Sequence, residues 1–206
     1  MERNKKILLL SGVLAVSIYA LHVVIGGFLW KGYSHLQQPI SDLTATGAPN
    51  KALMLLFTTI YGILALIFAV SFTISESKKH HKLVFWGGIS FIILHFISIT
   101  YGLFPQDLPD TAITFSGIMH IVITALIVPF TIVTPFLIGF GFKKEPNWKK
   151  FGIYSIITGI FILFFGGASG IFFAQKLPYF GLVERLNIGT LQLWTLLFSI
   201  KLLKTK

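Results

Sequence analysis

Three ionisable side chains are candidates for chemistry because each lies in or beside a long apolar stretch. Asp42 lies in the segment HLQQPISDLTATGAPN, residues 35–50, and Asp107 lies in GLFPQDLPDTA, residues 102–112. His120 follows inside an apolar run. Carboxylates and imidazoles serve in acid–base catalysis, bind metal ions and form hydrogen bonds with polar ligands. If the chain brings the three together, they form one polar site.

The neighbours of His120 place it on a polar helix face. Ser116 lies four residues before it and Thr124 four residues after it. Residues at this spacing share one face of an α-helix. In a helix that begins at Ala112, His120 lies about 12 Å along the axis, which is membrane depth. An ionisable residue at that depth usually faces the bundle interior and has a partner. A hydrogen-bonded structural histidine remains the alternative.

The acidic residues also have structural interpretations. Ser41 or Asp42 would cap a short helical turn in an ordered loop. Asp107 or Asp110 would begin the next helix, where a carboxylate meets the positive end of the helix dipole. A capping role explains the presence of one of these two aspartates well, but it explains the presence of both less well. Asp42 is therefore either a ligand or catalytic carboxylate, or part of a folded loop.

A second pair of charges precedes the last apolar stretch. Glu184 and Arg185 lie in QKLPYFGLVERLN, residues 175–187, at the expected top of a helix. Arg185 is a candidate to bind an anionic headgroup or to pair with an acidic residue of a neighbouring loop. Simple snorkelling of the side chain to the membrane interface is the alternative.

Four further histidines differ in their settings. His22 and His95 lie inside apolar stretches, and the sequence does not identify their partners. His80 and His81 lie in a basic segment, where we expect them to face solvent or lipid headgroups. No HExxH or HxxxH pattern occurs, and there are no cysteines to supply thiolates. We therefore predict no metal site and no cofactor.

The elements that must position these residues are transmembrane helices. The chain of 206 residues is 54% hydrophobic and only 12% charged, and the apolar residues fall into long blocks. We predict a single all-α membrane domain, residues 1–206, that forms a bundle of six transmembrane helices. The predicted helices are Ile7–Trp30, Lys51–Ile74, Leu83–Phe104, Ala112–Phe142, Phe151–Ala174 and Leu186–Leu203. Pro129 and Pro135 predict a kink in the fourth helix. Gly166 and Gly170 predict close helix packing within the chain.

The connecting charges predict an orientation. Most basic residues fall on one side if six helices alternate: Arg3, Lys5, Lys6, Lys78, Lys79, Lys82, Lys143, Lys144, Lys149, Lys150, Lys204 and Lys206. The positive-inside rule makes that side, including both termini, cytoplasmic. The net charge of +10 is thus explained by topology and does not indicate nucleic acid as a partner. The first apolar stretch is too long for a signal peptide, and we expect it to remain as a helix.

Three segments resemble a known family. They are PISDLTATGAPN at residues 39–50, GLFPQD followed by His120, and GLVER followed by Trp194. In their order and spacing, these resemble the bacterial membrane proteins of domain-of-unknown-function family 998. The first two segments are also similar to the wider Frag1, DRAM and Sfk1 group, whose pattern falls on Ile40, Ser41, Asp42, Phe104 and His120. The resemblance implies a bacterial cytoplasmic membrane protein with a lipid-linked role.

These observations leave three functions open. The first is a non-enzymatic protein that binds membrane lipids through an outward-facing polar pocket. Asp42, Asp107, His120, Ser41 and Ser116 are the pocket candidates, with Arg185 and Glu184 at its rim. The second is a membrane-embedded hydrolase or transferase that acts on a lipid, with the same residues in acid–base or metal chemistry. The third is a small-solute transporter, although the helices lack the usual paired intramembrane charges.

Overall fold

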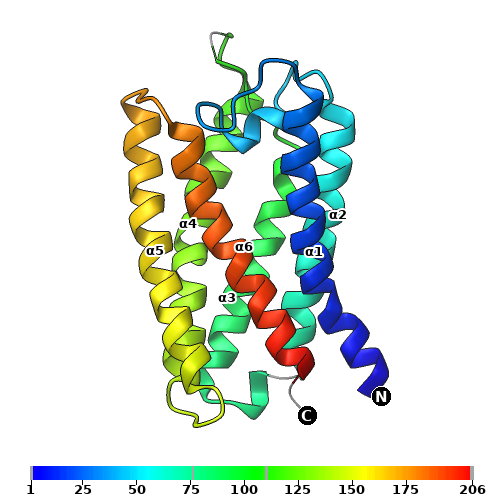
Figure 1. Cartoon of the computed structure of the whole chain (residues 1–206), viewed down its shortest axis with the longest axis vertical. Coiled ribbons are helices and arrows are strands. Elements are labelled where there is room, and N and C mark those ends of the chain that lie inside the picture. The colour runs from blue at the N-terminus through cyan, green and yellow to red at the C-terminus, as the bar shows by residue number, and fades with distance from the viewer. Residues whose placement is uncertain (1, 76, 110, 205–206) are drawn as a thin grey trace.

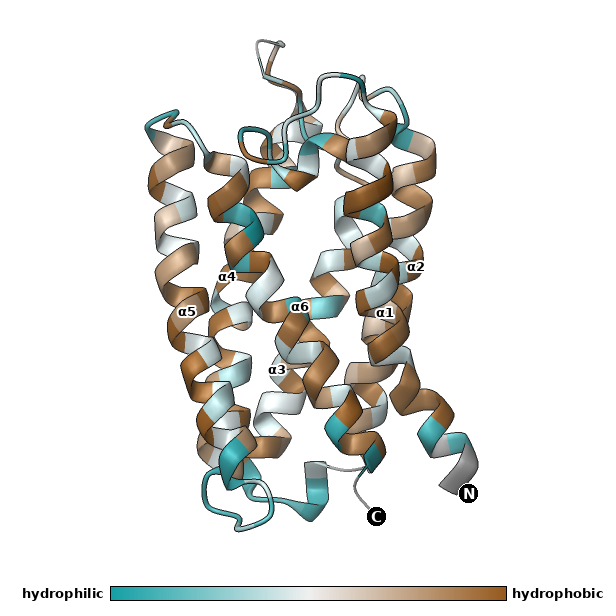
Figure 2. Cartoon of the chain, in the orientation of Figure 1, coloured by the Kyte–Doolittle hydropathy of each residue, from teal (hydrophilic) through white to brown (hydrophobic). Residues whose placement is uncertain are grey.

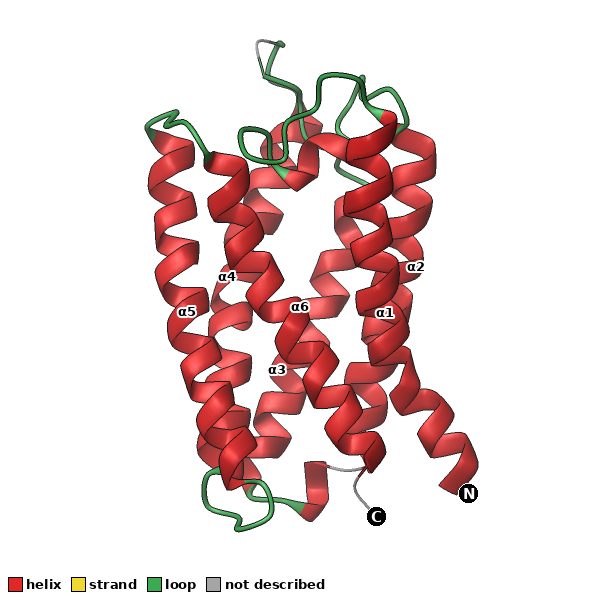
Figure 3. Ribbon diagram, in the orientation of Figure 1, coloured by secondary structure: helices red, strands yellow, loops and turns green. Residues whose placement is uncertain are grey.

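The structure is a computed structural model that describes residues 2–75, 77–109 and 111–204. Expectations that involve Asp110 or the charge of Lys206 fall outside these residues. Six long α-helices make up about three quarters of the described chain (Figure 3). They are α1 (Glu2–Leu29), α2 (Lys51–Ser75), α3 (Lys82–Ile99), α4 (Phe115–Phe142), α5 (Lys149–Ala174) and α6 (Phe180–Lys204). All six are long and apolar enough to cross a membrane, which confirms the predicted fold class.

The helices form a ring in chain order (Figure 1). Each packs against the next, and α6 closes the ring against α1. The loops 30–50, 100–114 (of which residues 100–109 and 111–114 are described) and 175–179 lie at one end, called here the upper end after its place in Figure 1. The start of α1, the end of α6 and the loops 77–81 and 143–148 lie at the opposite, lower end.

Hydrophobic residues predominate along the helices, and hydrophilic residues concentrate at the two ends of the bundle (Figure 2). Large side chains such as Phe28, Phe96 and Phe164 are more than half exposed on the helices. In water such a surface would be unfavourable, whereas hydrocarbon solvates it well. Helices satisfy their own backbone hydrogen bonds, which is the condition for crossing a bilayer.

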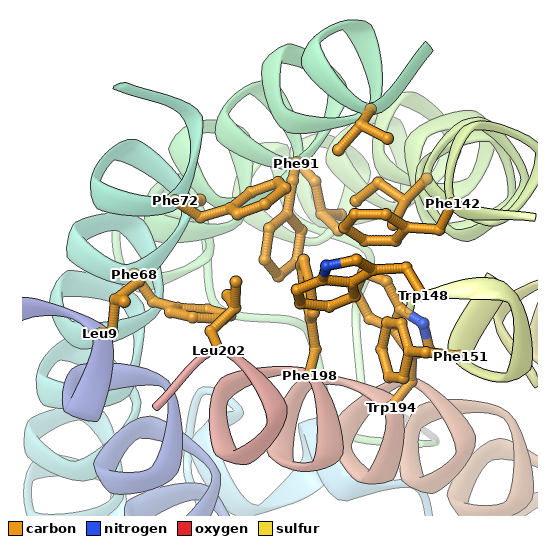
Figure 4. Packing of buried hydrophobic residues seen from close by; sticks show 14 of the residues in the cluster. Leu9, Phe68, Phe72, Phe91, Phe142, Trp148, Phe151, Trp194, Phe198 and Leu202 are labelled. Atoms are coloured by element: carbon orange, nitrogen blue, oxygen red, sulfur yellow. The ribbon is translucent and has the colours of Figure 1, made fainter. Parts of the chain in front are cut away.

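Aromatic side chains fill the interior of the lower half (Figure 4). Phe142 stacks on Trp148 with ring centroids 4.2 Å apart, and Phe198 lies 5.1 Å from both Phe151 and Trp194. The one polar atom of Trp194 donates from Nε1 to the hydroxyl of Ser155, at 2.9 Å. This rigid lower half contrasts with the polar interior of the upper half.

Two helices, α6 and α4, begin at other residues than predicted, and polar side chains explain both differences. α6 begins at Phe180, ahead of the predicted Leu186, so Glu184 and Arg185 lie inside the helix. Their charges are accommodated there because the 30–50 loop supplies hydrogen-bond partners. α4 begins at Phe115 because Thr114 is its N-cap, and it continues through Pro129 and Pro135 without interruption.

The expected packing role of two glycines in α5 holds for only one of them. A β-carbon at Gly166 would lie 3.6 Å from Asn187 of α6, an ordinary contact distance. Gly170 faces open space, with nothing within 4 Å, so the prediction of packing within the chain is wrong at this residue.

Candidate functional site

Asp42 is fully buried at the upper end, in the short 3₁₀ helix Ile40–Thr44. Its carboxylate accepts hydrogen bonds from the side-chain amides of Gln38, at 3.5 Å, and Gln106. Pro39 is the N-cap of this helix and makes no side-chain capping bond, so the proposed capping role of Asp42 or Ser41 is not what the loop uses. Burial raises the pKa of Asp42 to about 6, against the opposing effect of the two amides.

The GLFPQD segment joins this loop to α4. The imidazole Nδ1 of His120 lies 3.0 Å from the carbonyl oxygen of Phe104, and the Ser116 hydroxyl donates to the carbonyl of Pro105 at 2.7 Å. The amide of Thr46 donates to the carbonyl of Gln106 at 2.9 Å. One short segment therefore holds the 30–50 loop on one side and the first turns of α4 on the other.

Asp107 organises the start of α4. Its carboxylate accepts from the backbone N–H of Thr114 at 2.7 Å and from the hydroxyl of Thr114 at 2.8 Å. The Thr114 oxygen in turn accepts from the N–H of Gly117 at 3.1 Å. A β-carbon at Gly117 would collide with the Asp107 carboxylate. Thr114 is therefore the N-cap of α4, and Asp107 holds Thr114 in place instead of capping the first turn of the helix itself, as was predicted for Asp107 or Asp110.

Glu184 and Arg185 connect α6 to the 30–50 loop. Glu184 accepts from the backbone N–H of Ile40 at 2.6 Å. Arg185 donates to the carbonyl of Gln38 at 2.7 Å and to the hydroxyl of Tyr33 at 2.6 Å. The Tyr33 hydroxyl itself donates to the carbonyl of Pro39 at 2.7 Å. The guanidinium is therefore engaged with the protein instead of extending to the membrane surface.

The backbone of the same loop caps α6. The N–H groups of Gly181 and Leu182 donate to the carbonyls of Gln37 and Leu36, at 3.2 and 3.0 Å. The first amides of a helix lack intrahelical partners, and here the loop supplies them. A β-carbon at Gly181 would collide with the carbonyl oxygen of Gln38, so the GLVER glycine is required by close approach.

The structure thus links the predicted residues through one framework, but it gives each a protein partner. Asp42, Asp107 and His120 all contact residues of segment 104–114 or its neighbours. For Ser41, the hydrogen bond found is one its backbone carbonyl accepts from Thr44. In the described part of the chain, no group of three or more His, Asp or Glu residues is placed to hold a metal ion. What these residues do in the structure is join loops to helices.

A second group of polar residues, in the bundle interior, was not located by the sequence. His22 and His95 are almost fully buried, and both ring nitrogens of each lack a hydrogen-bond partner. Gln192 donates to the hydroxyl of Tyr61 at 2.7 Å, but its carbonyl oxygen is unpartnered. Tyr19 connects the group, with its ring centroid 5.8 Å from that of His22 and 4.8 Å from that of Tyr61. We call these five residues the interior polar cluster.

The interior polar cluster lies below the upper-end network. Tyr61 is ten residues from the start of α2, a depth of about 15 Å. Gln192 lies about two helical turns below Arg185 on α6. Between the upper-end network and the interior polar cluster, the side-chain oxygen Oδ1 of Asn187 and the Nε of Arg185 are also buried without partners. Polar side chains in apolar runs were visible in the sequence, but only the helix arrangement shows that they share one region.

At the lower end, one expectation is wrong. His80 was expected to face solvent or headgroups, yet its side chain is only 11% exposed and binds Glu145, with Nδ1 2.6 Å from Oε2. Its ring also contacts Phe142 and Trp148 edge-on. Glu145 lies on a different loop, so the sequence offered no local signal for this pair.

The fold and the site define a multi-pass helical membrane protein whose upper half has a polar interior. The chain belongs to the family described as "Protein of unknown function (DUF998)", which matches residues 13–201 and confirms the resemblance found from the three segments. Searches of curated proteins and of solved structures give no match.

Proposed function

We propose that the protein binds a membrane lipid, without transforming it, through the polar interior of its upper half. The proposal also places the chain in the cytoplasmic membrane of a bacterium, with the upper end outside. The basic residues of the lower end support this orientation, because cytoplasmic loops are enriched in Lys and Arg.

One observation carries the proposal: the buried polar atoms that have no partner. His22, His95 and Gln192 leave five such atoms in the bundle interior, and Arg185 and Asn187 add two above them. Leaving a buried donor or acceptor unpaired costs about 1–3 kcal/mol. Proteins rarely keep several such groups together unless a ligand or water satisfies them. A polar headgroup that enters from the upper end would supply both donors and acceptors.

The loop before α4 supports entry from the membrane. Leu103, Ile113 and Phe115 are 73%, 81% and 72% exposed, although they are large and apolar. Side chains of this kind at the end of a bundle insert into the boundary between headgroups and acyl chains. The route into the polar interior would therefore begin in lipid instead of in water.

The enzymatic alternative gains no support from the geometry. The Asp107 carboxylate already accepts two hydrogen bonds from Thr114, and His120 is held by the carbonyl of Phe104. Either residue would have to leave its partner, and disturb the start of α4, before it could act on a substrate. Binding would leave these contacts intact, because the unpartnered atoms belong to other side chains, which a headgroup would reach by displacing the residues that bury them.

Lipid retention tests the proposal. The protein would be purified in a mild detergent, and the lipids that remain would be identified by native mass spectrometry. His95→Phe and Gln192→Leu are expected to lose most of the bound lipid. Thr195→Val is the matched control, because Thr195 is buried on α6 but is satisfied by the carbonyl of Leu191 at 3.0 Å.

Wild-type-like retention in both interior variants would refute the proposal. Asp107→Ala and His120→Ala form a separate arm of the same measurement. Retention that is unchanged in these two variants would limit Asp107 and His120 to their structural roles, and the binding region would then be the interior polar cluster alone.

A further inference from the structure

The lower end has a hollow of about 600 Å³ where the loop between α2 and α3 meets the loop between α4 and α5. Its lining residues are Lys79, His80, His81, Lys144, Glu145, Pro146, Asn147 and Trp148. The hollow lies far from the upper-end network, at the opposite ends of the same helices. Nothing in the proposed lipid site makes use of it.

The single acid of the hollow is fully engaged. One oxygen of Glu145 lies 2.6 Å from His80 Nδ1, and the other accepts from the backbone N–H of His81 at 2.9 Å. These two bonds fix the loops relative to each other. The His80 ring is also wedged against Trp148, with centroids 5.2 Å apart. The remaining side-chain charge lining the hollow is that of Lys79 and Lys144.

The hydrogen bonds of His81 determine where its proton lies. The backbone N–H of Leu83 donates to His81 Nδ1 at 3.2 Å, so this nitrogen carries a lone pair and no hydrogen. The proton of the neutral ring must then be on Nε2. Nε2 lies 3.2 Å from the ammonium nitrogen of Lys144, which is itself a donor without a lone pair. The Nε2–H group of His81 and the ammonium group of Lys144 are therefore both hydrogen-bond donors, and they face each other at 3.2 Å in the lining of the hollow.

Facing donors are satisfied when an acceptor with several lone pairs lies against both. An anionic oxygen meets this need better than water does, because the ammonium group of Lys144 is positively charged. We propose that the hollow binds a phosphate group, with His81 Nε2 and Lys144 Nζ donating to its oxygens. The phosphate is either a free ion or part of an anionic phospholipid headgroup. Both can reach the hollow, because it lies at the lower end of the bundle, where α3 and α5 begin.

Basic loops alone would not create such a site. The positive-inside rule requires lysines near the cytoplasmic surface but does not require them to converge on a fixed donor. Lys143 provides the matched comparison, because it is adjacent to Lys144, exposed, and outside the hollow. Lys143→Gln and Lys144→Gln remove the same charge from the same loop.

The experiment has two arms on the full-length protein in nanodiscs. In the first, inorganic phosphate is titrated into phosphatidylcholine nanodiscs, and binding is followed by the ¹⁵N shift of His81 Nε2. In the second, nanodiscs contain phosphatidylglycerol, and bound lipid is counted by native mass spectrometry. His81→Asn joins the lysine variants, because asparagine retains an N-cap acceptor while it removes the ring donor.

Lys144→Gln and His81→Asn are expected to weaken binding about tenfold in the arm that detects the ligand, with Lys143→Gln near wild type. A response to inorganic phosphate identifies free phosphate as the ligand, and a response only to phosphatidylglycerol identifies the headgroup. Equal losses in Lys143→Gln and Lys144→Gln would overturn the proposal, because they indicate diffuse electrostatics. Absence of binding in both arms would also overturn it. If the lipid-binding proposal for the upper end failed its own test, the phosphate-binding results at the lower end would be unaffected.

Discussion

The side-chain amide of Gln106, just before α4, donates to the carboxylate of Asp42, just after α1. The two residues are separated by two transmembrane helices in the sequence. Their contact places a fully buried carboxylate between two loops, with a second amide from Gln38 on its other oxygen. The upper end is thus stabilised by polar side chains, whereas the lower half is stabilised by aromatic packing.

Removing the Gln106 amide is expected to destabilise the protein. Gln106→Ala would leave one oxygen of a buried carboxylate without its donor, and the remaining bond from Gln38 is long at 3.5 Å. A lost hydrogen bond to a charged group of this kind costs about 1.5–3 kcal/mol. Thermal unfolding in detergent would measure the effect. Gln175→Ala, at an exposed position after α5, is the control and should unfold like wild type.

Asp42 also predicts a dependence of stability on pH. Its pKa is raised to about 6 in the folded protein, from an ordinary value of 3.8. The folded state therefore binds the proton more tightly than the unfolded state does. The contribution of Asp42 to stability is greatest below about pH 4 and is lost as the pH rises through 6. Between pH 5 and pH 7.5, we expect the free energy of unfolding to fall by about 1.4 kcal/mol, because only about one pH unit of this range lies below the folded pKa.

The comparison that isolates this effect is Asp42→Asn, which cannot ionise. Stability profiles of the wild type and the variant would be measured over the same pH range. The difference between them should change with pH in the direction given above. Parallel profiles would show that Asp42 does not titrate in this range.

Gly181 tests the docking of the 30–50 loop on α6. A β-carbon there would collide with the backbone carbonyl of Gln38, which cannot rotate away as a side chain would. Gly181→Ala should therefore cost about 1–3 kcal/mol, in the range of overpacked cores. Gly189→Ala lies on the same helix with nothing within 4 Å, so it should be neutral or mildly stabilising. Equal effects of the two substitutions would argue against the close loop–helix contact.

The orientation in the membrane can be tested because the chain contains no cysteine. Single cysteines would be placed at Lys31, in an upper loop, and at Lys143, in a lower loop. Both positions are exposed. A membrane-impermeant maleimide added to intact cells should label Lys31→Cys and spare Lys143→Cys until the cells are permeabilised. The reverse pattern would place the basic end outside.

The sequence was sufficient for the number of helices and for the roles of residues whose partners are nearby in the chain. Apolar blocks long enough to span a membrane predicted the six helices, and Asp107 could be placed near the start of α4 because it closely precedes the apolar run of that helix. The length of α6 was underestimated because charges usually end a span. Glu184 and Arg185 lie inside α6 only because a loop more than a hundred residues earlier binds them.

The interior polar cluster could not be assembled from sequence for a related reason. Each of its members is an isolated polar residue in an apolar helix, and periodicity describes one helix at a time. That His22, Tyr61 and Gln192 share one region depends on how α1, α2 and α6 are rotated and staggered. Packing of the whole ring sets those angles, and no local pattern specifies them.

The substitution His95→Phe distinguishes an effect on lipid binding from an effect on the free energy of unfolding. Its ring is almost fully buried, meets Phe91 at a centroid distance of 4.6 Å, and leaves both nitrogens unpaired. If a lipid headgroup normally satisfies these nitrogens, His95→Phe should bind less lipid. In lipid-depleted protein, the same change removes an unsatisfied polar group and replaces it with an apolar ring of similar size. It should then raise the free energy of unfolding, by about 1–3 kcal/mol.

The two effects have opposite signs, and this is what makes the variant informative. Unfolding would be measured for wild type and His95→Phe, each with and without added lipid extract. Lipid should stabilise the wild type more than the variant, and the variant should be the more stable protein when lipid is absent. If His95→Phe is instead destabilised in both conditions, the imidazole is satisfied within the folded chain, and the interior polar cluster is then a structural feature and not a binding region.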